Sequence, residues 1–103
     1  MKVFQKHFGT EKSQITWGEA WKILSDLPLE DWGDHGMFTS VAPHIWIGAY
    51  ADPLSNTLFV GVWETEDPHD PHEWRSWKGW VFRDTYPETL ILPDDSVGIW
   101  EEG

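Results

Sequence analysis

The stretch of the chain that decides the fold runs from residue 44 to residue 63 and reads HIWIGAYADPLSNTLFVGVW. It contains two runs of alternating residues, joined by the turn-forming segment DPLSN at 52–56. Successive side chains of a strand point to opposite sides. The pattern therefore predicts a β-hairpin whose loop has several residues.

The two faces of this hairpin differ in chemistry. One face is aliphatic and carries Ile45, Ile47, Ala49, Leu58, Val60 and Val62. The other face is rich in rings and glycines and carries His44, Trp46, Gly48, Tyr50, Phe59, Gly61 and Trp63. Because cross-strand neighbours on one face touch, we expect the glycines to leave a notch between the rings.

Length and composition set the class of protein. The chain has 103 residues, the size of one domain, so residues 1–103 are expected to form a single domain. The absence of cysteine excludes disulfides and thiolate metal sites and suits a reducing compartment. No apolar run matches a signal peptide or a membrane span of about 20 residues. These features predict a soluble, cytoplasmic protein.

Charge is the strongest bulk signal. Eighteen acidic residues against seven Lys and Arg give a formal net charge of -11. Between residues 23 and 74 there is no Lys or Arg, and the acidic residues there are Asp26, Glu30, Asp31, Asp34, Asp52, Glu64, Glu66, Asp67, Asp70 and Glu73. Such a field repels nucleic acids and anionic membranes and favours a basic partner. The alternative is that the acidic surface only aids solubility.

Tryptophan is the second unusual feature, with nine residues in a small chain. Each indole ring covers a large area and seeks a partner for its N–H group. Some of the nine are therefore expected at the surface, where Trp is a favoured anchor for partners. The alternative is that they fill a core that has few aliphatic side chains.

One helix is predicted over residues 17–27. Thr16 and Glu19 have the spacing of a capping box. The apolar residues that follow fall on one helical stripe, namely Trp17, Ala20, Trp21, Leu24 and Leu27. Pro28 ends the helix, because the residue before a proline avoids helical geometry.

The remaining segments predict strands and loops. Strands are expected at 2–8, as a short edge strand, and at 77–83, 89–92 and 97–100. Loops are expected at 9–13, 28–40 and 64–73. The sum is an α+β domain, with an antiparallel sheet of four to five short strands and one helix packed on one face.

The sequence leaves two positions for that helix. We expect it to pack on the aromatic face, where its Trp-rich stripe would enter the notch beside Gly48 and Gly61. The functional site would then lie on the acidic loops 30–34 and 64–73. In the alternative the helix covers the aliphatic face, and the aromatic face is free to bind another molecule.

The sequence does not favour any of three kinds of catalytic or metal site. His69 and His72, with neighbouring acids, are possible zinc ligands, but Pro68 and Pro71 prevent a helix from placing them on one side. Paired carboxylates beside Trp rings resemble the sites of sugar hydrolases, although the chain is short for such a cleft. No serine lies in a Gly-x-Ser-x-Gly frame, and no phosphate-binding glycine loop is present. We expect a protein that is not an enzyme and needs no metal or cofactor.

The sequence instead predicts an acidic interaction protein that inhibits a basic, nucleic-acid-binding protein by imitating the phosphates of nucleic acid. Phages and mobile elements make small acidic inhibitors of this kind against host defence systems, and some toxin antidotes act likewise. No direct contact with nucleic acid or membrane is expected. The predicted partner-binding residues are Glu30, Asp31, Trp32, Asp34, Glu64, Glu66, Asp67, Asp70, Glu73 and Trp74. The alternatives are a small-ligand or carbohydrate-binding module that uses exposed Trp and Tyr, and a metal protein or enzyme that uses the 69–73 loop.

Overall fold

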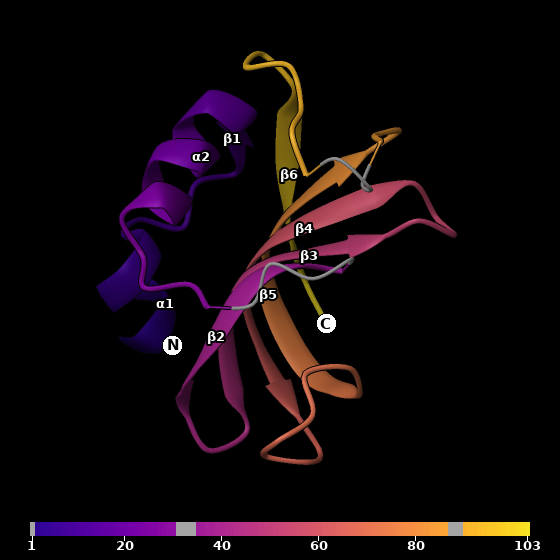
Figure 1. Ribbon diagram of the computed structural model, residues 1–103. Coiled ribbons are helices and arrows are strands. Elements are labelled where there is room, and N and C mark those ends of the chain that lie inside the picture. The colour runs from indigo at the N-terminus through magenta and orange to yellow at the C-terminus, as the bar shows by residue number, and fades with distance from the viewer. Residues whose placement is uncertain (1, 31–34, 87–89) are drawn as a thin grey trace.

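The computed structural model of the protein describes residues 2–30, 35–86 and 90–103, and these form helices and one sheet (Figure 1). Along the chain the elements are α1 (Lys2–Phe8), β1 (Gln14–Thr16), α2 (Trp17–Ser25), β2 (Gly36–Ala42), β3 (Ile45–Asp52), β4 (Thr57–Thr65), β5 (Trp74–Arg83) and β6 (Val97–Glu102). The sheet is antiparallel, in the order β1-β6-β5-β4-β3-β2. The predicted α+β class is confirmed, but the described residues form six strands and two helices rather than four to five strands and one helix.

The hairpin at the centre of the sequence is also at the centre of the sheet. Strands β3 and β4 pair with the predicted alternation, and residues 53–56 form the turn between them. Strand β5 continues the same pattern on the other side of β4. Ring therefore faces ring and glycine faces glycine in the cross-strand pairs Trp46–Trp63, Gly48–Gly61, Tyr50–Phe59, Trp63–Trp77 and Gly61–Gly79, and Phe59 faces Val81.

The predicted capping box begins helix α2. The Glu19 backbone N–H donates to the Thr16 hydroxyl oxygen over 3.2 Å, and the Thr16 backbone N–H donates to the Glu19 carboxylate over 3.3 Å. These two bonds satisfy donors that have no partner within the first turn. The helix ends at Ser25, two residues before the predicted end, and Pro28 follows shortly after.

The predicted edge strand at residues 2–8 is wrong, because this segment is helix α1. Phe4 and Phe8 are four residues apart, so a helix places both on one side, and both are buried. A strand would also have put them on one face, but Lys6 would then share that buried face, whereas it is exposed in the helix. The ring of Phe4 packs on Trp80 and Trp100, with centroid distances of 5.3 and 4.9 Å.

Two further expectations fail. Residues 36–40 of the predicted loop at 28–40 belong to edge strand β2, which begins at Gly36. Met37 and Phe38 are both buried, on opposite faces of the sheet, so the sequence here lacks the apolar–polar alternation that indicates a strand. Residues 90–92 of the predicted strand 89–92 form no strand. Leu90 has a φ of 54°, which an extended chain does not allow, and Leu92 inserts into the core. Residue 89 lies outside the described residues.

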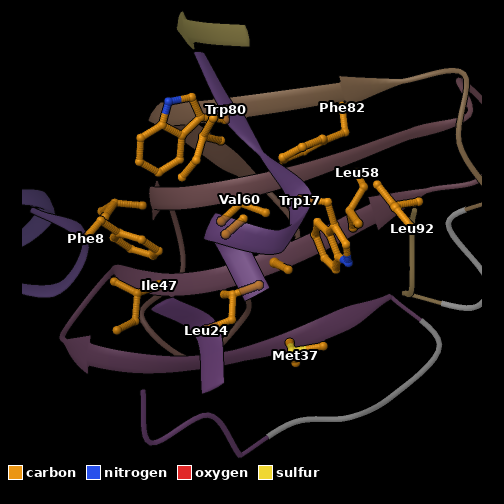
Figure 2. Packing of buried hydrophobic residues seen from close by; sticks show 14 of the residues in the cluster. Phe8, Trp17, Leu24, Met37, Ile47, Leu58, Val60, Trp80, Phe82 and Leu92 are labelled. Carbon is orange, nitrogen blue, oxygen red and sulfur yellow. The ribbon is translucent and has the colours of Figure 1, made fainter. Parts of the chain in front are cut away.

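The expected packing of the helix on the aromatic face is also wrong. Both helices lie on the aliphatic side of the sheet (Figure 1). Figure 2 shows Phe8, Trp17 and Leu24 of the helical layer together with Ile47, Leu58 and Val60 of the sheet. The aliphatic rows offer a continuous surface for the helices, whereas the notch on the aromatic side is filled by a side chain of the sheet itself, as described below.

The chain is folded tightly. Its Cα radius of gyration is 12.3 Å, close to the value of about 13 Å expected for a compact chain of this length. Within the part of the chain that the structure describes, the helices are too short to cross a membrane.

Candidate functional site

The side of the sheet that faces away from the helices, called the open face below, forms a second apolar cluster. Its buried members are Phe38, Phe59, Trp63 and Val81, and its partly buried members are Trp46, Tyr50, Trp74 and Trp77. Among the described residues, no helix covers this face (Figure 1). A sheet face that carries so many rings without a covering layer is a candidate interaction surface.

Cross-strand register arranges the open face in rows. From one end to the other, the rows over β3, β4 and β5 are Asp52–Thr57–Arg83, Tyr50–Phe59–Val81, Gly48–Gly61–Gly79 and Trp46–Trp63–Trp77. Charged and polar groups therefore occupy one end, and indole rings occupy the other. The glycine row lies between two rows of large side chains.

The Phe59 ring fills the notch of the glycine row. A Cβ atom added to either Gly61 or Gly79 would lie 2.9 Å from the Phe59 Cζ atom. A Cβ atom added to Gly61 would also lie 2.7 Å from the Gly79 Cα atom. The two backbones and the ring therefore occupy the space that a side chain at either glycine would need.

The β4–β5 loop is tied onto the open face by indole groups. The rings of Trp63 and Trp74 stack with a centroid distance of 4.7 Å and an interplanar angle of 16°. Both indole N–H groups donate to the Pro71 carbonyl oxygen, over 3.1 and 2.8 Å. Trp46 donates to the hydroxyl oxygen of buried Thr65 over 3.0 Å. These bonds hold the loop beside the aromatic cluster.

The open face contains a cleft of about 910 Å³. Its rings come from five separate segments and include Tyr50, Phe59, Trp74, Trp77, His35 and His72. Its charged side chains are Asp52, Arg83, Asp84 and Glu101. A cleft of this size with an apolar lining and a few polar groups has the general form of a ligand or partner site.

The charges in the cleft do not balance. Two nitrogens of the Arg83 guanidinium donate to the two carboxylate oxygens of Glu101, one of them over 3.1 Å. The hydrogen bond from Arg83 holds the pKa of Glu101 below its ordinary value. Asp52 and Asp84 form no ion pair with another described residue. The cleft thus has three carboxylates and one guanidinium.

Tyr50 lies at the centre of a group of rings at the edge of the cleft. The His35 ring stacks on it at 5.8 Å, and the His72 ring meets it edge-on at 5.9 Å. The His72 imidazole shares a hydrogen bond of 2.7 Å with the Asp70 carboxylate. Burial, followed by the charges of Asp52 and Asp70, raises the pKa of the Tyr50 phenol. The phenol therefore stays neutral and can act as a hydrogen-bond donor at neutral pH.

The predicted partner-binding residues are only partly brought together. Asp31, Trp32 and Asp34 lie outside the described residues. Arg75 binds both Glu64 and Glu66, at 3.1 and 3.6 Å, so these two carboxylates are partly neutralised.

The rest of the predicted set follows the β4–β5 loop. Asp67 and Asp70 accept hydrogen bonds from backbone N–H groups two residues on, Glu73 is exposed, and Trp74 lines the cleft. Glu30 lies at another surface depression, beside Phe38 and Trp46. His35, next to the undescribed segment, has its ring 5.6 Å from that of His72, so one contact does join the two predicted loops.

Sequence reasoning missed the cleft residues outside those loops. They are Tyr50, Asp52, Trp77, Arg83, Asp84 and Glu101. Strand alternation already placed Tyr50 with Phe59, and Trp77 with Val81, on common faces. The signal that could have found the site was this alternation carried across all three strands, whereas acidic composition pointed to the loops.

Positive charge without an ion-pair partner among the described residues lies on the helical layer. Lys12, Arg75, Lys78 and Arg83 form ion pairs with carboxylates. The other cationic side chains in the chain, Lys2, Lys6 and Lys22, have no carboxylate partner among the described residues and lie on α1 and α2. The helical layer thus carries the uncompensated cations, and the open face does not.

The described residues offer no cluster of three or more His, Cys, Asp or Glu side chains suited to hold a metal ion. His72 is hydrogen-bonded to Asp70, and His69 is exposed on the same loop. The chain matches no protein-family model, no curated protein and no solved structure.

Proposed function

We propose that this protein is a non-enzymatic binding protein that docks its open face on the basic surface of another protein. The observation that carries the proposal is the uncovered aromatic cleft, whose three carboxylates outnumber its single guanidinium. Protein interfaces are enriched in Trp and Tyr, and such rings dominate their binding energy when they become buried.

Charge decides the kind of partner. The protein has a formal net charge of -11, and its uncompensated lysines are on the far, helical layer. A basic surface is attracted to the open face and is repelled only from the helical side. Long-range attraction of this kind accelerates association and aligns the two molecules before they touch.

The partner class that fits best is a nucleic-acid-binding protein, whose basic groove is already adapted to rows of negative charge. Occupation of that groove would exclude the nucleic acid, so binding would inhibit the partner. This is the mode of action expected of an anti-defence protein or an antidote. We place this function in the cytoplasm as part of the same proposal, since the chain has no cysteine.

The test is a titration of the protein with a peptide rich in Lys and Arg, in which Trp fluorescence reports binding. A Glu-rich peptide of equal length is the control. Affinity for the basic peptide should fall by roughly tenfold or more between about 0.05 M and 0.5 M sodium chloride. The double variant Asp52→Asn/Asp84→Asn should bind more weakly than the matched variant Asp26→Asn/Asp95→Asn, which removes two charges outside the cleft. Affinity that does not change with salt, or equal losses in the two variants, would contradict the proposal.

A second candidate function is a small-ligand or carbohydrate-binding module. It is favoured by one specific observation: Tyr50, Trp74 and Trp77 line the cleft and are only partly buried. Aromatic rings of this kind stack on sugars. Titration with a panel of oligosaccharides, read by quenching of Trp fluorescence, tests it, and binding should then be insensitive to salt. No quenching by any glycan would remove this candidate.

A further inference from the structure

We infer that the cleft of the open face receives an extended, proline-containing segment of the basic partner. Its prolines lie on the indole rings at one end of the cleft, and an Arg or Lys side chain reaches the carboxylates at the other end. This inference rests on the proposed function and specifies the conformation and sequence pattern of the segment that docks. Three features of the cleft support it: its length, the chemistry of its two ends, and its free hydrogen-bond donors.

The cleft extends along the strands. Trp77 and Arg83 both line it and lie six residues apart on β5, which corresponds to about 20 Å at roughly 3.4 Å per residue. The rows between them are Tyr50–Phe59–Val81 and the glycine row. One side chain is too short to contact both ends. A polyproline II segment rises about 3.1 Å per residue, so about six residues of such a chain cover the distance.

The two ends of the cleft differ in chemistry. At one end the partly buried rings of Trp74 and Trp77 meet at a centroid distance of 6.5 Å and an angle of 61°, so they offer two inclined apolar surfaces. At the other end Asp52 and Asp84 have no ion-pair partner among the described residues. Asp52 accepts hydrogen bonds of 3.1 and 2.8 Å from the 53–56 turn, which orient its carboxylate without neutralising it. The cleft therefore suits a ligand that is apolar at one end and cationic at the other.

The middle of the cleft needs no charge from the ligand. Arg83 and Glu101 lie on neighbouring strands, on either side of the cross-strand pair Val81–Ile99, and form a two-pronged ion pair. The Phe59 ring lies in the same row as Val81. The segment between the prolines and the cation can therefore be uncharged.

Free donors favour an extended ligand over a helical one. The Tyr50 hydroxyl and the Trp77 indole N–H form no hydrogen bond with another described residue, whereas the Trp74 indole N–H donates to the Pro71 carbonyl. The carbonyl groups of a polyproline II segment have no partner within the segment and can accept such bonds, whereas those in the interior of a helix cannot. Strands β3, β4 and β5 are paired on both sides, so the ligand cannot join the sheet there as a further strand.

Proline suits this cleft for two further reasons. It has no N–H group, so it brings no donor that would need an acceptor among the rings. Its backbone is already restricted to the extended conformation, so little conformational entropy is lost on binding, and aromatic-lined grooves recognise such segments for this reason.

The test compares peptides of about ten residues that contain two adjacent prolines and one Arg in an otherwise uncharged sequence. The Arg is placed about six or about two residues from the prolines, in both chain directions, and Trp fluorescence reports binding. In the better direction the wide spacing should bind roughly two- to fivefold more tightly, the gain expected for an exposed charge pair. Replacing both prolines by Ala should weaken binding by roughly fivefold or more.

Variants assign the two ends of the cleft. Asp52→Asn/Asp84→Asn should abolish the preference for the wide spacing, while the control variant that removes two charges outside the cleft should keep it. Trp77→Leu should abolish the advantage of proline over Ala. Its matched control Trp21→Leu changes an exposed indole on helix α2 and should keep that advantage.

The outcomes separate this inference from the function on which it rests. If basic peptides bind equally well with and without proline, or at either spacing, the inference is wrong while the proposed function stands. If no basic peptide binds, both are wrong. Should Trp77→Leu fail to fold, nuclear Overhauser contacts between the bound proline rings and the Trp77 ring of the unchanged protein decide: their presence supports the inference and their absence overturns it.

Discussion

At the scale of single residues, the paired glycines of β4 and β5 shape the site. Gly61 and Gly79 face each other across the strands, and the Phe59 ring lies over both. Without side chains at these positions, a phenylalanine of the sheet closes its own notch. The helical layer lies on the other side of the sheet, and the rings that surround the notch remain available to a partner.

Gly61→Ala is therefore expected to destabilise the protein. The new methyl group would lie 2.7 Å from the Gly79 Cα and 2.9 Å from the Phe59 ring, so backbone or ring must move. Overpacking of this kind costs about 1–3 kcal/mol of unfolding free energy. Urea denaturation measures the change. Gly18→Ala is the control, because a methyl group there has ordinary contacts of 3.5 Å and improves helix propensity. Equal stability of the two variants would show that the notch tolerates a side chain.

At the scale of elements, the capping box of α2 joins the helical layer to the sheet. Thr16 is both the last residue of β1 and the N-cap of α2, and its hydroxyl receives the Glu19 N–H. Thr16→Ala should lower the unfolding free energy by about 1 kcal/mol, whereas Thr16→Ser keeps the hydroxyl and should lose little. Thermal or urea unfolding of the two variants checks this. Equal losses would mean that the methyl group, and not the cap, is the stabilising part.

The same cap gives the helix a pH dependence. Hydrogen bonds from Thr16, followed by that from Lys12, lower the pKa of Glu19 from its ordinary value of 4.5. A carboxyl group whose pKa is lower in the folded state stabilises above its unfolded pKa, and this contribution is lost as the pH falls through the folded pKa. The stability difference between the unchanged protein and Glu19→Ala should thus be constant near neutral pH and shrink below about pH 4.5. A difference that grows in acid would contradict the assignment.

At the scale of the whole molecule, negative charge greatly exceeds positive charge. A formal net charge of -11 on 103 residues destabilises the compact state through repulsion among the carboxylates. At 0.1 M, sodium chloride largely screens the repulsion between exposed carboxylates that are more than about 10 Å apart. The melting temperature should therefore rise from low to moderate salt. Scanning calorimetry tests this, and a decrease would show that the ion pairs of the surface outweigh the repulsion.

The sequence by itself determined the features that depend on neighbours along the chain. Thr16 and Glu19 predicted the cap of α2 because their spacing matches one helical turn, and the period-two alternation of 44–63 predicted the faces of the hairpin. Strands β5 and β6 include the predicted segments 77–83 and 97–100. Residues 2–8 were misread because two phenylalanines at this spacing fit either a helix or a strand.

Only the tertiary structure decided which face the helices cover and which residues form the cleft. Tyr50, Trp77 and Glu101 belong to three different strands, and only the pairing of those strands brings them together. The helices cover the aliphatic rows, whereas the Phe59 ring occupies the glycine notch, and both are matters of volume rather than of pattern. Local periodicity records which side chains share a face; close packing between distant segments decides what that face meets, and with it where a partner can bind.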